Sequence, residues 1–352
     1  MNEGLKTADR MLDERGVQRD CGAYVTSLAF TRDQTHAVFG LGDGRLIFRA
    51  RTGTDWHEHA SHNGAVTALA ADFDGVGILS GGDDGTLQRF EPHQGAAQNL
   101  ARYGMKWIDH VLSVADRKAP LRAVAVGKNL HLLDQTGQTV RTLAHPSTIT
   151  GLALDAKAKR IGASHYNGAS LWFLRSDQSK PLSLEWKGSH LAIAIHPSLY
   201  AVATAMQENA LHGWRISDLQ HMRMSGYPAK PESLGFTASG KWLASAGAEA
   251  IILWPFFGGG PMGKAPLELA GGDQAMVKRI ACHPAHEVVA AGYSDGLVLV
   301  VDIERQRVLP VAAPGRGAIS ALGWSDDGAL LGVGTETGFV ALIDFSIKET
   351  AS

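Results

Sequence analysis

Three histidines stand close together in the segment WHEHASH, at positions 57, 59 and 62. On a β-strand, His57 and His59 project from the same side. Two imidazoles at this spacing are a donor pair suited to Zn²⁺ or Ni²⁺. No third ligand accompanies them, so zinc binding by His57 and His59 is an alternative hypothesis and not the leading one. No cofactor is predicted.

Motifs of enzyme active sites are missing from the sequence. It contains no phosphate-binding GxxxxGK[ST], no HExxH zinc-protease pattern and no GxSxG nucleophile elbow. Acidic residues are scattered at turns, so spacing assigns no carboxylate pair. A non-enzymatic function is therefore predicted, and a catalytic site assembled from distant loops is the less favoured alternative.

Charge and composition exclude several classes of partner. The chain of 352 residues has 33 Lys and Arg against 35 Asp and Glu, a net charge of −2, which gives no basic footprint for nucleic acid or an anionic membrane. Cys21 and Cys282 are the only cysteines, too few for a disulfide framework.

No segment is long and apolar enough to span a membrane, and the charged first residues lack the apolar core of a signal peptide. A cytoplasmic protein, favoured to be a monomer, is expected.

The elements that must position these residues come from an internal repeat. A short apolar pattern, seen best in VTSLAF, VTALAA and ISALGW, recurs along the chain at intervals of 41 or 42 residues, with one interval of 46. Its fourth position falls on Leu28, Leu69, Val111, Leu152, Ile193, Leu234, Ile280 and Leu322. Such regularity indicates a repeat architecture with eight units.

Each unit predicts a small antiparallel sheet. The apolar pattern is followed by a polar turn, a second apolar strand, and then a tight turn with Gly, Asn or Asp that leads into a third strand, as in DDGTLQRF. Asp-Gly between apolar runs is a strong hairpin signal, because glycine tolerates positive φ. With a weaker fourth strand, a unit of about 40 residues matches a propeller blade. The fold class is therefore all-β, a single β-propeller of eight four-stranded antiparallel blades, with seven blades as the alternative count.

The units resemble WD repeats, and the segment from His62 to Glu91 does so nearly position for position. The resemblance implies a buried hydrogen-bonded set formed by a His, a Ser or Thr, an Asp and a Trp. His62, Ser80 and Asp84 fill three of these places, while Phe90 replaces the Trp. A second unit offers the set His145, Ser164, Asn167 and Trp172. The resemblance is specific for the fold and not for one function, because this family does many things.

The last unit lacks enough chain for its own fourth strand. Only FSIKETAS follows Asp344, and an unpaired sheet edge would be costly. Residues around Asp13 to Cys21 are expected to supply that strand and close the ring. One domain thus spans residues 1–352, with residues 1–24 as tail and closing strand and residues 346–352 as a C-terminal tail.

The resemblance also implies where a partner docks. In WD-repeat propellers a protein or peptide often binds over the channel, on the face that carries the turns between the second and third strands. Inner-strand side chains alternate, so residues beside each branched apolar position are expected at this mouth. The predicted partner-binding residues are Tyr24, Asp83, Trp107, Asp109, Tyr166, Lys230, Met276 and Lys278. Aromatic anchors with a few charges are typical of binding hot spots. A protein-interaction scaffold is the leading hypothesis, with a metal-handling propeller as the alternative.

Overall fold

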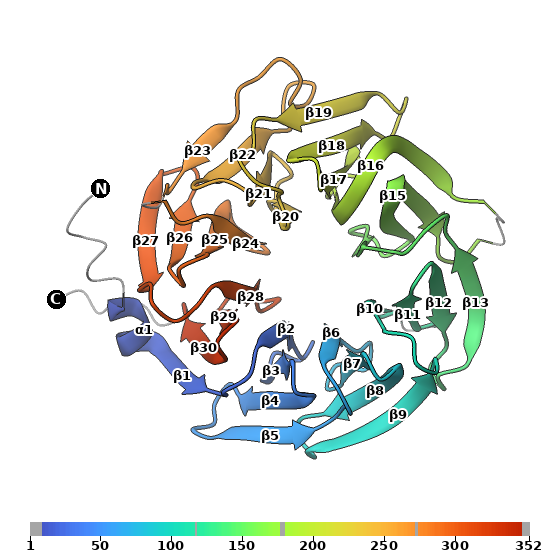
Figure 1. Cartoon of the computed structure of the whole chain (residues 1–352), viewed down its shortest axis with the longest axis vertical. Coiled ribbons are helices and arrows are strands. Elements are labelled where there is room, and N and C mark those ends of the chain that lie inside the picture. The colour runs from blue at the N-terminus through green and yellow to red at the C-terminus, as the bar shows by residue number, and fades with distance from the viewer. Residues whose placement is uncertain (1–8, 117, 177–179, 272–273, 347–352) are drawn as a thin grey trace.

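A computed structural model describes residues 9–116, 118–176, 180–271 and 274–346. Within them, antiparallel sheets follow one another around a common axis and form a ring, with their strands ordered from the inside outward (Figure 1). No helix in these segments is long and apolar enough to cross a membrane. The two terminal segments, residues 1–8 and residues 347–352, belong to the predicted tails and lie outside the described residues.

Five sheets have the four consecutive strands expected of a repeat unit. The first contains β2 (Val25–Phe30), β3 (His36–Leu41), β4 (Arg45–Ala50) and β5 (Trp56–Ala60). The second contains β6 (Val66–Ala71), β7 (Ile78–Gly82), β8 (Thr86–Glu91) and β9 (Ala96–Arg102). The third contains β10 (His110–Val114), β11 (Leu121–Val126), β12 (Asn129–Leu133) and β13 (Thr139–Ala144). Two later sheets contain β20 (Leu234–Phe236), β21 (Trp242–Ser245), β22 (Ile251–Pro255) and β23 (Leu267–Leu269), and β24 (Val277–Cys282), β25 (Val288–Tyr293), β26 (Val298–Asp302) and β27 (Arg307–Ala312).

One sheet has six strands and carries two sequence repeats. Its strands are β14 (Gly151–Leu154), β15 (Arg160–Phe173), β16 (Leu182–Ile195), β17 (Ala201–Met206), β18 (Ala210–Arg215) and β19 (His221–Ser225). β16 pairs with β15 over its first part and with β17 over its second. Counted as hydrogen-bonded sheets in the described chain, the ring has seven members. This is the alternative count, and the prediction of eight separate sheets is corrected: β16 continues from one repeat into the next without a break.

The N-terminal strand closes the ring, as predicted. β1 (Gly16–Asp20) pairs antiparallel with β30 (Phe339–Asp344) and completes the sheet that also contains β28 (Ile319–Trp324) and β29 (Leu330–Thr335). The first and last described parts of the chain therefore lie side by side in Figure 1.

The expected start of this strand was wrong. Residues 13–15, predicted to be extended, belong to the helix α1 (Arg10–Arg15). β30 ends at Asp344, one residue beyond Ile343, the partner of Gly16, so it offers no strand partner for Asp13 or Glu14. The helix instead buries Leu12 in a cluster with Val311 and Ile343.

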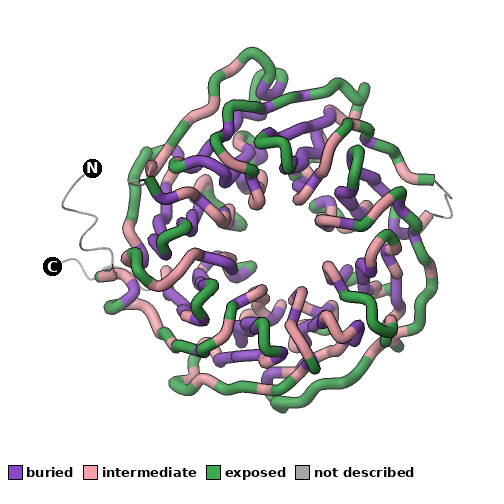
Figure 2. The backbone as a smooth tube through the Cα atoms, in the orientation of Figure 1, coloured by how far each residue is buried: buried purple, intermediate pink, exposed green. Residues whose placement is uncertain are grey.

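Apolar clusters between neighbouring sheets form the core. Val25, Phe39 and Ile47 of the first sheet, for example, pack against Val340 and Leu342 of the last. Figure 2 shows the middle strands of the sheets mostly buried, the innermost strands largely intermediate and the outermost strands largely exposed. Each sheet thus covers a face of the next, which is why a single repeat cannot be stable alone.

Hydroxyl groups also join neighbouring inner strands. Thr67 Oγ1 donates to the carbonyl of Ile108 at 2.6 Å, and Ser320 Oγ donates to that of Val25 at 2.6 Å. Thr150 donates in the same way to the carbonyl of His190. These bonds fix the inner strands around the channel and hence the face that they border.

Candidate functional site: the mouth of the ring

The mouth is the face on which inner strands begin and second strands end. A recurring backbone hydrogen bond ties the two together. Gly42 N donates to Tyr24 O at 2.8 Å, Asp83 N to Ala65 O at 3.1 Å, and Ser294 N to Met276 O at 2.8 Å. Tyr24 and Met276 therefore occupy equivalent positions before their inner strands, and Asp83 occupies the facing position after a second strand.

Three aromatic side chains are exposed on this face. Tyr24 is 43% exposed, Trp107 63% and Tyr166 57%. Tyr24 and Trp107 precede inner strands, whereas Tyr166 lies at the bulge in β15 next to Asn167, which has a φ of 66°. Large aromatics are usually substantially buried, so packing alone does not account for these three. Met276, which precedes the inner strand β24, is half-buried.

The polar residues predicted at the mouth differ in burial and in whether their charged groups already have a partner. Lys230 is exposed but forms an ion pair with Glu232 at 2.9 Å. Asp109 accepts a hydrogen bond from Gly127 N at 3.0 Å, so its carboxylate serves a turn. Asp83 and Lys278 are half-buried. The aromatic residues are thus more available to a partner than the charges.

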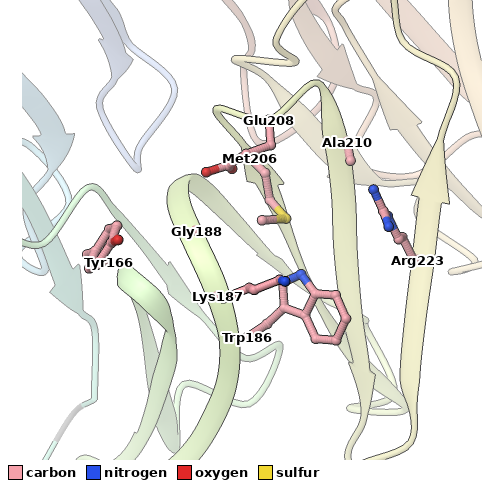
Figure 3. A pocket seen from close by; sticks show the side chains of 8 residues that line it. All are labelled: Tyr166, Trp186, Lys187, Gly188, Met206, Glu208, Ala210 and Arg223. Carbon is pink, nitrogen blue, oxygen red and sulfur yellow. The ribbon is translucent and has the colours of Figure 1, made fainter.

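A cavity of about 310 Å³ opens on the same face beside Tyr166. Figure 3 shows Tyr166 on one side and Arg223 on the other, with Trp186 and Met206 between them. Trp186 and Arg223 come from β16 and β19, and Met206 ends β17. Sequence reasoning missed the cavity, because its lining combines residues from two repeats that no single motif connects.

Trp186 is held firmly at the base of this cavity. Its ring stacks on that of His212, with centroids 4.0 Å apart and an interplanar angle of 14°. His212 is fully buried and lies 3.0 Å from His221 between ring nitrogens. The Nε2 of His190 contacts the carbonyl of Trp186 at 2.9 Å. Burial, with a smaller effect of His221, lowers the pKa of His212 to about 3, so this support is neutral near pH 7.

The structure brings His62, Ser80 and Asp84 together. Nδ1 of His62 lies 3.1 Å from Asp84 Oδ1, and Nε2 lies 2.6 Å from Ser80 Oγ. Burial keeps the pKa of His62 below its usual value despite the nearby carboxylate. Burial alone would raise the pKa of Asp84, but hydrogen bonds from Asn63 N, Thr86 N and His62 bring it below its usual value. A neutral histidine therefore donates from Nδ1 to an ionised aspartate and accepts from the serine hydroxyl.

Comparison with known families agrees with this geometry. The family model "WD domain, G-beta repeat" matches residues 53–90, which contain the His62 set, and the model "Anaphase-promoting complex subunit 4 WD40 domain" matches residues 282–352. Two stretches of the chain are therefore similar to WD-repeat families, and both lie within the ring of antiparallel sheets.

A solved structure supports the fold of this chain. The crystal structure of the computationally designed Ika8 protein has a TM-score of 0.72 at 21% identity, covering 93% of this chain and 98% of that one. At this identity the likeness concerns the fold alone. The search of curated proteins returns no match.

The second predicted WD-repeat set is only half assembled. Trp172 Nε1 donates to His145 Nε2 at 3.1 Å. Ser164 instead contacts Thr150 Oγ1 at 3.1 Å, and Asn167 accepts from Gly188 N at 3.2 Å. The pKa of His145 falls to about 4 because of burial and, to a lesser degree, His165. The expected set of four is therefore corrected to a pair: the hydroxyl of Thr150 contacts the serine, and the asparagine side chain accepts from the backbone of β16.

A further WD-repeat set was missed because tyrosine takes the histidine position. Trp254 Nε1 donates to Tyr227 Oη at 2.8 Å, and Tyr227 Oη lies 2.6 Å from Ser245 Oγ. Burial raises the pKa of Tyr227, so its hydroxyl stays neutral and able to donate. The only signal in the sequence was the third-strand Trp254, which without a histidine did not identify a set.

The two candidate metal ligands lie on the outer strand β5. His57 stacks on Phe48 with ring centroids 5.4 Å apart, and His59 packs against Phe90 at 5.1 Å. Among the described residues, no group of three or more His, Cys, Asp or Glu side chains is placed to hold a metal ion. In this arrangement the two imidazoles cover apolar rings, and His62 points into its own set.

Proposed function

We propose that the protein is a non-enzymatic scaffold that binds a segment of another protein across the mouth of the ring. The observation that carries this proposal is the exposure of Tyr24, Trp107 and Tyr166 on one face. Exposed aromatic side chains gain much apolar contact for little conformational entropy when a partner covers them. The balanced charge favours a protein over nucleic acid.

The test is affinity isolation from native cells with the full chain, followed by mass spectrometry. A Trp107→Ala/Tyr166→Ala double variant is expected to lose partners that the wild type retains. Phe257→Ala is the matched control, because Phe257 is also exposed, at 48%, but lies in the loop between β22 and β23, away from the mouth. Partners retained equally by all three proteins would contradict the proposal.

We also propose that the six-stranded sheet acts as two blades at the mouth, so that eight repeats border the channel. The course of β15 supports this proposal. Leu174 N donates to Lys159 O at 3.0 Å, so the ends of β15 meet. β15 therefore folds back near Asn167-Gly168, as a hairpin does, and supplies the second and third strands of one repeat. The predicted cytoplasmic location and monomeric state stay predictions.

A further inference from the structure

The side chains that line the cavity beside Tyr166 include two cations and only one carboxylate. Lys187 and Arg223 line it and are exposed, and neither forms an ion pair within the described residues. Its one acidic lining residue, Glu208, accepts a hydrogen bond from Ser189 N at 3.1 Å. The carboxylate is therefore partly committed, whereas both cations are available to a ligand.

The base of the cavity is apolar and rigid. Trp186 is fixed by its stack on His212, and the side chain of Met206 is buried. An indole face and a thioether together suit a large apolar side chain, because the ring gives area and methionine adapts its shape. Since Trp186 is already ordered, a ligand need not order it on binding.

Gly188 keeps this space open. Its φ is +118°, and a Cβ built on it would lie 2.8 Å from both Met206 Cε and Glu208 Oε1. Any side chain at this position would therefore push into the two residues that border the cavity. The backbone crossing from one repeat to the next leaves room for a side chain from elsewhere.

We propose that this cavity receives an acidic residue and an adjacent large apolar residue from an extended segment of the partner protein. The inference rests on the proposed function and names the chemistry of its partner. The carboxylate pairs with Arg223, for which two parallel hydrogen bonds are the favoured geometry, and Lys187 adds to the attraction. The apolar side chain lies on Trp186 and Met206. A basic segment would meet two cations and one committed carboxylate.

Selection from a random heptapeptide display library with the full chain tests this chemistry. Selected peptides are expected to be enriched in Asp or Glu next to Leu, Ile, Phe or Met. A selected peptide is then synthesised with its acidic residue and with the matching amide. The wild-type protein is expected to bind the amide form roughly tenfold more weakly, the size of a lost charged hydrogen bond. Enrichment of basic residues, or equal binding of both forms, would overturn the inference.

Two surface variants locate the binding. Arg223→Glu is expected to weaken binding of the acidic peptide at least about tenfold, while Arg307→Glu, which alters an exposed arginine on the outer strand β27, leaves it unchanged. Binding that depends on Trp107 but is unaffected by Arg223→Glu overturns the cavity assignment and sustains the proposed function. Binding unaffected by Arg223→Glu and by Trp107→Ala/Tyr166→Ala overturns both, as does a library that yields no binder.

Discussion

The sheet β6–β9 and the sheet β20–β23 solve the same packing problem with different side chains. In the first, His62 uses two ring nitrogens to bridge Ser80 on β7 and the turn residue Asp84. Phe90 fills the third-strand position and is fully buried, with no polar atom to satisfy. This set ties the loop before the inner strand to the hairpin turn.

In the sheet β20–β23 the bridging group is a single oxygen. Tyr227 Oη accepts from Trp254 on β22 and contacts Ser245 on β21. It therefore ties the loop to the third strand and not to the turn. The difference shows that the repeat preserves a bridging position next to a second-strand serine, while the partner on the other side can be a carboxylate or an indole.

Tyr227→Phe is expected to have the largest effect on stability. It leaves the buried Trp254 Nε1 without its acceptor and deprives Ser245 of a partner, and should lower the free energy of unfolding by about 2–3 kcal/mol. Urea denaturation measures it, with the exposed Tyr166→Phe as a matched control within about 0.5 kcal/mol of wild type. In the Tyr227→Phe background, a further Trp254→Phe should cost less than in wild type. Additive losses would show that the two residues do not interact.

Removing the shared serine should separate the two sets. Ser80→Ala leaves the buried Nε2 of His62 without a partner and should cost about 1–2 kcal/mol. Ser245→Ala should cost about 1 kcal/mol, since Tyr227 keeps its bond from Trp254. The same denaturation experiment compares them. A larger loss for Ser245→Ala would reverse the ranking of the two bridges.

The pH dependence of stability should also distinguish the His62 set from the Tyr227 set. Because burial lowers the pKa of His62 in the folded chain, the unfolded chain binds a proton below about pH 6.5 that the folded chain does not. The stability that the neutral His62 contributes is therefore present above that pH and is lost as the pH falls. Other buried histidines act in the same direction, so the comparison is between variants. His62→Gln should flatten the fall in stability between pH 6.5 and 5 by up to about 1.4 kcal/mol per pH unit. Tyr227→Phe should leave the slope unchanged, and equal slopes for all three proteins would exclude His62 as a contributor.

The smallest effect is expected from Asp84→Asn. The amide oxygen still accepts from Asn63 N or Thr86 N, but the charge-assisted bond from His62 weakens, for a loss of about 1 kcal/mol or less. Asp326→Asn, at an exposed turn, is the control. A loss equal to that of Tyr227→Phe would mean that the carboxylate, and not the bridge, dominates the His62 set.

Local patterns in the sequence predicted most of the fold. The spaced apolar anchors located the inner strands, and the missing fourth strand after Asp344 predicted the pairing of β1 with β30. The helix α1 was not predicted, because Met11 and Leu12 are adjacent apolar residues in a short charged segment and fit a helix or a strand equally. The join at Gly188, which merges two repeats into one sheet, depends on backbone pairing that side-chain patterns do not encode.

The mouth was predictable only in part, for the same reason. Tyr24, Trp107 and Tyr166 followed from their place relative to each anchor, and the structure leaves them exposed. Trp186 and Arg223 lie on different strands, and their juxtaposition arises when β16 passes from β15 to β17. Whether Ser164 turns to His145 or to Thr150 is decided by competing hydroxyl contacts of similar strength, which residue types alone do not rank.

The pairing of Gly16 with Ile343 has a consequence for biosynthesis. During synthesis, β1 has no partner until β30 has been made, more than 300 residues later. Until then the backbone groups of β1 and the uncovered side of the newest blade stay unpaired, and unpaired strands promote aggregation. A chain that stops before β30 should therefore fail to close its ring and be degraded as a whole, and should not persist as a protein short of one blade.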